Sequence, residues 1–249
     1  MKKKRAIGKF SYQTDMGKVR LSNEDQALAM TNSKGDILLI VCDGMGGQSH
    51  GEVASKLAVE IFQEEFEKNP FLPNPFFEKV WMRNVANKIN KIIFKESETN
   101  EIYKGMGTTL TAVIVSGTHI TVGQIGDSRL YWLQNREFSQ LTIDQTYVES
   151  LYRNGKISKE EMEIHPERHV LLNALGTYPV LNIDLSVHKY NKETLLLCSD
   201  GLYNNVSPKD METIMKLDDS PQQKCDELIS LANANGGSDN IAIVYWEAR

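Results

Sequence analysis

The chain contains 249 residues, of which 41% are hydrophobic and 24% are charged, with 33 Asp and Glu against 28 Lys and Arg. This apolar content excludes an intrinsically disordered chain, and the net charge of −5 argues against a nucleic-acid-binding surface, which would need Lys and Arg to neutralise phosphates. The longest apolar run, residues 37–42, is too short to cross a membrane. We therefore predict one globular domain over residues 1–249, without nucleic-acid or membrane partners.

The cysteines favour a reducing compartment. Cys42, Cys198 and Cys225 are odd in number and lack Cys-x-x-Cys spacing, so they predict neither a disulfide framework nor a zinc site. The basic run at residues 2–5 is not followed by an apolar segment, so it indicates a solvated tail and not a signal peptide. We expect a cytoplasmic protein.

Segments rich in Val, Ile, Leu and Thr recur along the chain, and several are nearly continuous, as in strands that are buried on both faces. The predicted strands cover residues 9–14, 28–31, 36–42, 108–115, 119–124, 129–133, 184–188, 194–198 and 240–247.

Two long segments, residues 52–68 and 75–96, have apolar side chains at helical spacing, and a proline-rich bend at 69–75 joins them. The apolar stripe of the second segment includes Phe77, Val80 and Trp81. Ser-Pro pairs at 207–208 and 220–221 predict the starts of two later helices. A capping box at 158–161 predicts a short helix in the middle of the chain. Strands, paired helices, more strands and a mixed end predict an α+β layered fold, with antiparallel sheets and helices on their outer faces.

Four aspartates stand at the ends of predicted strands: Asp43, Asp127, Asp200 and Asp239. A single Asp-Gly after a strand is usually a turn, but four such positions in a compact domain indicate a shared site. Neighbouring carboxylates repel one another unless a cation lies between them, and all-oxygen ligands favour Mg²⁺ or Mn²⁺.

Arg20 precedes an acidic pair, Glu24 and Asp25. A guanidinium matches the oxygens of a phosphate group, so Arg20 is a candidate phosphate-binding residue. The alternative is a surface arginine in an ordinary ion pair.

Six motifs follow one another along the chain: Arg20…Asn23-Glu24-Asp25, Asp43-Gly44-Met45-Gly46-Gly47, Met106-Gly107-Thr108-Thr109, Gly126-Asp127-Ser128-Arg129, Cys198-Ser199-Asp200-Gly201-Leu202 and Gly237-Ser238-Asp239-Asn240-Ile241. In this order and spacing they resemble the PP2C (PPM) family of metal-dependent protein serine/threonine phosphatases, in its compact bacterial form, from about residue 9 to residue 246.

The resemblance implies a β-sandwich of two antiparallel sheets flanked by pairs of helices, with two Mg²⁺ or Mn²⁺ ions, and often a third, at one end. By this resemblance Asp43 bridges the first two ions, Asp200 and Asp239 complete the first, and the Gly44 carbonyl serves the second.

For the remaining residues, the resemblance implies that Glu24 and Asp25 support the second ion, partly through water. Asp127 is expected to bind the third ion, and Arg20 the phosphate group. The metals would activate a water for direct attack on phosphorus.

The resemblance also implies a helical flap over about residues 142–175. His50, His165 and His169 are candidate proton donors, each of which could equally be structural. The chain departs from the usual pattern at Gln48 and Gln145, where relatives often have histidine.

The implied activity is hydrolysis of phosphoserine and phosphothreonine in phosphoproteins, with a Ser/Thr kinase as a further expected partner and a monomer as the default state. The competing hypothesis is a non-catalytic phosphoprotein-binding module on the same fold. The haloacid dehalogenase motif Asp-x-Asp-x-Thr is absent from the sequence, and so is a P-loop motif.

Overall fold

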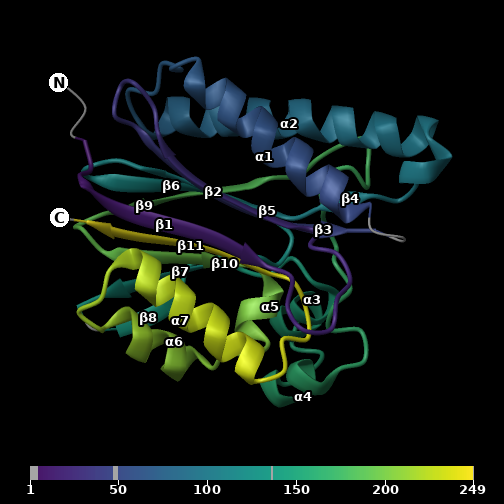
Figure 1. Cartoon of the computed structure of the whole chain (residues 1–249). Coiled ribbons are helices and arrows are strands. Elements are labelled where there is room, and N and C mark those ends of the chain that lie inside the picture. The colour runs from purple at the N-terminus through teal and green to yellow at the C-terminus, as the bar shows by residue number, and fades with distance from the viewer. Residues whose placement is uncertain (1–4, 47–49, 136, 249) are drawn as a thin grey trace.

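In the computed structural model, which describes residues 5–46, 50–135 and 137–248, two antiparallel sheets pack face to face. Figure 1 shows helices α1 and α2 covering the outer face of one sheet and helices α6 and α7 covering that of the other. The predicted α+β sandwich with flanking helix pairs is confirmed. Residues 2–4, Gly47 and Gln48 lie outside the described residues.

All neighbouring strands of both sheets run antiparallel. The first sheet has the order β1 (Gly8–Asp15), β11 (Ile241–Ala248), β10 (Thr194–Cys198), β7 (Arg129–Gln134) and β8 (Glu137–Gln140). The second has the order β2 (Asp25–Thr31), β3 (Ile37–Met45), β5 (Leu110–Val115), β6 (His119–Ile125) and β9 (Asp184–Lys189), and β4 (Gly107–Thr108) pairs with the end of β3.

Several helices begin at residues whose side chains cap them, whereas α1 and α5 have no side-chain cap. The side chain of Asn74 caps α2, those of Ser207 and Ser220 cap α6 and α7, and Ser158 and Glu161 form the predicted capping box of α4. The helices are α1 (Gly51–Glu67), α2 (Pro75–Thr99), α3 (Tyr147–Arg153), α4 (Lys159–Ile164), α5 (Asp200–Tyr203), α6 (Pro208–Met215) and α7 (Pro221–Ala234), with a 3₁₀ turn at Glu101–Tyr103. None of those in the described residues is long and apolar enough to span a bilayer.

Strand β3 is covered on both faces, which explains why its sequence is continuously apolar. Ile37, Leu39 and Val41 point into the core between the two sheets. Leu38 and Ile40 alternate with them and pack in the core beneath α1 and α2. Because both faces are covered, every residue from 37 to 42 is apolar and buried, and the strand is held rigidly up to its last residues.

Some details differ from the prediction. Strand β8 has only one apolar side chain, Phe138, and lies at an edge, so it has no apolar pattern. Phe77 and Val80, expected in the buried stripe of α2, are 41% and 37% exposed, and Trp81 is only partly buried, because the buried face of the helix runs instead through Glu78 and Met82 in the same turns. The insert at about residues 142–175 contains α3 and α4. The boundaries of a single domain over 1–249 stay a prediction.

Candidate functional site

A pocket of about 480 Å³ lies where several strands of both sheets begin or end. Five carboxylates and one guanidinium line it, so its formal charge is strongly negative. Its lining residues are Arg20, Glu24, Asp43, Gly44, Met45, Gly46, Thr109, Asp127, His169, Leu171, Asp200, Asp239 and Asn240. The structure thus brings together every predicted site residue except Asp25.

The backbone of Asp43 is held by hydrogen bonds to two threonines. Its N–H donates to the Thr109 hydroxyl (2.9 Å), while its carbonyl accepts from the Thr108 hydroxyl (2.9 Å) and the Thr109 N–H (2.8 Å). The sequence indicated only a strand at these threonines, so this supporting role was missed. Gly44 fits tightly, because a Cβ there would collide with the carbonyls of Glu24 and Gly51.

Asp25 lies behind the pocket and does not line it. It is opposite Asp43 in the β2–β3 register, is only 1% exposed, and accepts a hydrogen bond from the Ser199 hydroxyl (2.6 Å). Burial raises the pKa of Asp25 to about 7, although the Ser199 hydrogen bond lowers it. Alternation along the strand separates the acidic pair, so Glu24 lines the pocket while Asp25 is buried beneath it.

Arg20 forms an ion pair with Asp239, with 2.7 Å between Nη2 and Oδ2. Arg20 is therefore in an ion pair here, as its alternative role predicted, but its partner Asp239 is itself one of the strand-end aspartates. The loop that carries Arg20 is fastened by Asn240, whose side-chain amide donates to the carbonyls of Met16 (2.9 Å) and Ser22 (2.8 Å). In the sequence, Asn240 stood out only as part of the motif at residues 237–241, and this role was not predicted.

Asp127 is buried beside Tyr203, whose hydroxyl donates to its Oδ2 (3.3 Å). Burial raises the pKa of Asp127 to about 6, and the charge of Asp144 adds to this rise. Gly126, at φ +87°, makes the turn that places Asp127 after β6. Tyr203 was missed because α5 is too short to show helical periodicity.

The carboxylates repel one another. Burial, followed by the charges of Asp25, Asp200 and Asp127, raises the pKa of Asp43 well above its usual value. Burial and neighbouring aspartates do the same to the pKa of Asp200. Among the described residues, however, no group of three or more His, Cys, Asp and Glu side chains is arranged to hold a metal ion.

Of the three candidate histidines, His169 lines the pocket, and burial lowers its pKa. His50 packs edge-on against Tyr103, and His165 packs against Tyr147. Neither His50 nor His165 is among the lining residues.

Comparison with known proteins identifies the family of the chain. The family model described as "Protein phosphatase 2C" matches residues 16–238. The serine/threonine phosphatase stp of Listeria welshimeri is 39% identical over 237 residues, which cover 95% of this chain and 94% of that protein.

Solved structures are also similar. Serine/threonine phosphatase Stp1 from Staphylococcus aureus superposes with a TM-score of 0.94 at 31% identity, covering 100% of this chain and 98% of the other. The catalytic domain of the phosphatase PstP in complex with two manganese ions gives a TM-score of 0.84 at 30% identity, covering 97% and 98%. These matches confirm the predicted family and set aside a non-catalytic module: the chain belongs to the protein phosphatase 2C family of enzymes.

Proposed function

We propose that this phosphatase hydrolyses phosphoserine and phosphothreonine in proteins by direct attack of water, with two Mg²⁺ or Mn²⁺ ions, and in some states a third, held by the pocket carboxylates. The single observation that carries the proposal is the convergence of five carboxylates and Arg20 on one pocket. The manganese complex of a related catalytic domain supports this class of cofactor.

The donor set fits a hard divalent cation, because all its ligand atoms are oxygens, and a cation among them would offset the burial and mutual repulsion that raise the pKa of Asp43 and Asp200. The described side chains are not already arranged around an ion, so these carboxylates would have to move when one binds. Asp43, Asp200 and Asp239 would hold the first ion, and Asp43 with the Gly44 carbonyl the second. Glu24 would assist the second ion and Asp25 would support it from beneath. Asp127 would hold the third.

The bound ions would lower the pKa of a water molecule and neutralise charge on the phosphoryl oxygens. The chain's own residues position the reacting groups. Thr108 and Thr109 fix the Asp43 backbone, so the point from which its carboxylate extends into the pocket is set. Arg20 is free to hold a phosphate once its guanidinium leaves Asp239, and its side chain is 55% exposed, so the movement costs little burial.

Of the candidate proton donors, only His169 lines the pocket, and burial lowers its pKa below the usual value for histidine, so at a given pH it is protonated less often than a solvated histidine. Phosphoproteins as a class follow from the proposed reaction, while a partner kinase, a monomeric state and a cytoplasmic location stay predictions.

The test is hydrolysis of p-nitrophenyl phosphate and of a phosphothreonine peptide, with Mn²⁺ or with EDTA. Asp239→Asn is expected to lower turnover by at least about a hundredfold, because even outer partners of metal ligands are worth 10- to 100-fold. Its melting temperature should change little, since the Asp239 side chain is partly exposed.

Asp219→Asn, at an exposed position between α6 and α7, is the matched control and should retain full activity. Undiminished hydrolysis in EDTA, or in Asp239→Asn, would contradict the proposal.

A further inference from the structure

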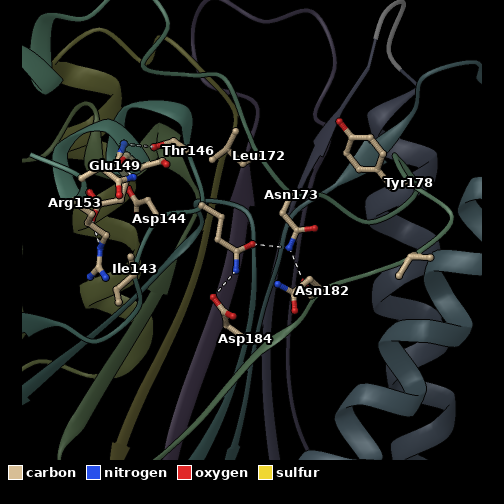
Figure 2. A pocket seen from close by; sticks show the side chains of 14 residues that line it. Ile143, Asp144, Thr146, Glu149, Arg153, Leu172, Asn173, Tyr178, Asn182 and Asp184 are labelled. Atoms are coloured by element: carbon tan, nitrogen blue, oxygen red, sulfur yellow. Dashed lines mark hydrogen bonds and ion pairs between the residues drawn. The ribbon is translucent and has the colours of Figure 1, made fainter. Parts of the chain in front are cut away.

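A second pocket, of about 510 Å³, lies between α3 and the chain at residues 172–184 (Figure 2). It shares no lining residue with the carboxylate pocket, and the proposed reaction makes no use of it. We call it the docking pocket.

One chain segment separates the two pockets. His169 and Leu171 line the carboxylate pocket, while Leu172 and Asn173 line the docking pocket. The segment is fixed against the start of the insert, because the Leu172 N–H donates to the Gln145 carbonyl (2.8 Å). A wall of a single extended segment is about 5–10 Å thick, and a peptide must also reach into the pocket on each side of it, so about three to six extended residues, or about 10–20 Å, would connect the two pockets.

The rim of the docking pocket exposes large apolar side chains. Val180 is 84% exposed, Tyr178 61%, Leu172 49% and Ile143 45%. Scattered apolar side chains are ordinary on a protein surface, but four around one concavity are typical of a binding site.

The floor is polar and already ordered. The Gln145 side-chain oxygen accepts from the Gly126 N–H (2.9 Å) and from the Asn173 amide (2.8 Å), and its amide donates to Asp184 (2.9 Å). Figure 2 shows the bonds from this floor to Asn173 and Asp184, and the further bond from Asn173 to Asn182. Such a floor loses little entropy when a ligand binds.

The charge of the docking pocket favours a cation. Asp144 is neutralised by Arg129 (2.7 Å) and Glu149 by Arg153 (2.9 Å). Asp184 accepts from the uncharged Gln145, and in the part of the chain that the structure describes it has no cationic partner. A Lys or Arg of a ligand would supply one.

We infer that the docking pocket binds a segment of the phosphoprotein substrate that lies apart from the phosphorylated residue and carries a Lys or Arg beside an apolar side chain. The inference rests on the proposed function for the identity of the occupant. The wall shared with the carboxylate pocket supports a segment of the same substrate chain, the exposed rim accounts for the apolar residue, and Asp184 accounts for the cation.

Two phosphothreonine peptides test this inference, identical except for Arg-Leu or Glu-Gly placed three to six residues from the phosphothreonine. The wild-type protein should prefer the Arg-Leu peptide by about tenfold in kcat/KM, the effect of burying one apolar side chain. The double variant Tyr178→Ala/Val180→Asn, which removes apolar surface without changing the charge, should abolish the preference, and Asp184→Asn should reduce it. Hydrolysis of p-nitrophenyl phosphate, which cannot reach the docking pocket, should stay unchanged in all of them.

The control is Phe71→Ala, which removes a strongly exposed side chain near the start of α2 and should keep the preference. Fluorescence anisotropy with the unphosphorylated peptides measures binding without catalysis. If the wild-type protein binds the Arg-Leu peptide more tightly and the double variant does not, the docking pocket is supported. This holds even if no hydrolysis is found, because that result would contradict only the proposed reaction. Equal handling of both peptides by the wild-type protein, or a preference that survives in the double variant, overturns the inference.

Discussion

Breaking the ion pair between Arg129 and Asp144 by removing one partner is expected to destabilise the protein strongly. Arg129 Nη2 lies 2.7 Å from Asp144 Oδ2, Nε donates to both carboxylate oxygens, and Nη1 donates to the Tyr131 hydroxyl (3.0 Å). The guanidinium carbon also lies 3.5 Å above the centre of the Tyr203 ring. The side chains are only 24% and 12% exposed, so water can replace few of these contacts.

Asp144→Ala would leave the Arg129 charge largely buried without its partner. Removing one member of a buried pair costs about 3–5 kcal/mol, and the residual exposure of Arg129 lowers the expected loss in the free energy of unfolding to about 2–4 kcal/mol. For a chain of this size 1 kcal/mol corresponds to about 2–4 °C, so a loss of about 3 kcal/mol lowers the melting temperature by about 6–12 °C.

Thermal unfolding followed by circular dichroism measures the shift. Glu212→Gln is the matched control, because it breaks the more exposed pair between Glu212 and Lys216 (2.6 Å), which is worth less than about 0.5 kcal/mol. The double variant Arg129→Met/Asp144→Leu should recover much of the loss by removing the uncompensated charge. A melting temperature for Asp144→Ala no lower than that of the control, or a double variant no more stable than Asp144→Ala, would refute the reasoning.

Three further measurements follow from the buried groups and the carboxylate pocket. Ser199→Ala should destabilise the protein to urea by about 2–3 kcal/mol, because it leaves the buried Asp25 carboxyl and the Ala242 N–H without the Ser199 hydroxyl. Ellman's reagent should react with none of the three cysteines in the native protein and with all three after denaturation, since each thiol is buried and burial raises its pKa, which keeps the thiolate scarce even at pH 8. Mn²⁺ at about 100 times its Kd should stabilise the protein by about 2.7 kcal/mol, or about 5–10 °C, whereas an unmoved melting temperature would count against a metal site.

The elements predicted well from sequence are those whose pattern is decided by burial. Residues 37–42 are apolar throughout because two cores cover β3, and this same burial places Asp43 at the point where the covered part of the strand ends. Capping residues identified α4, α6 and α7 because the capping interactions are local. Strand β8 and helix α5 escaped prediction, since an exposed edge strand and a four-residue helix carry no periodic apolar pattern.

Side-chain partners at the site depended on contacts between distant parts of the chain. The pairing of Arg20 with Asp239 and the burial of Asp25 against Ser199 join residues far apart in sequence. No spacing rule connects such positions. The sequence could place these residues near the same end of the sandwich, but it could not predict that Asp25 would lie behind the pocket.

Gln145 links these observations. It occupies a position where the resemblance to the family led us to expect histidine, a departure that lies outside the carboxylate set and bears on substrate preference and on any role for an imidazole. In the structure its backbone and side chain contact the Gly126 turn that precedes Asp127, and its side chain also orders Asn173 and Asp184 in the floor of the docking pocket. A histidine has two ring nitrogens and no amide oxygen, so it could not reproduce the two accepted and two donated bonds of Gln145. A change of the side chain at residue 145 would therefore alter the docking pocket directly and reach the carboxylate pocket indirectly, through the Gly126 turn and the segment at residues 169–173, so selection among substrates can vary without loss of the residues proposed to hydrolyse them.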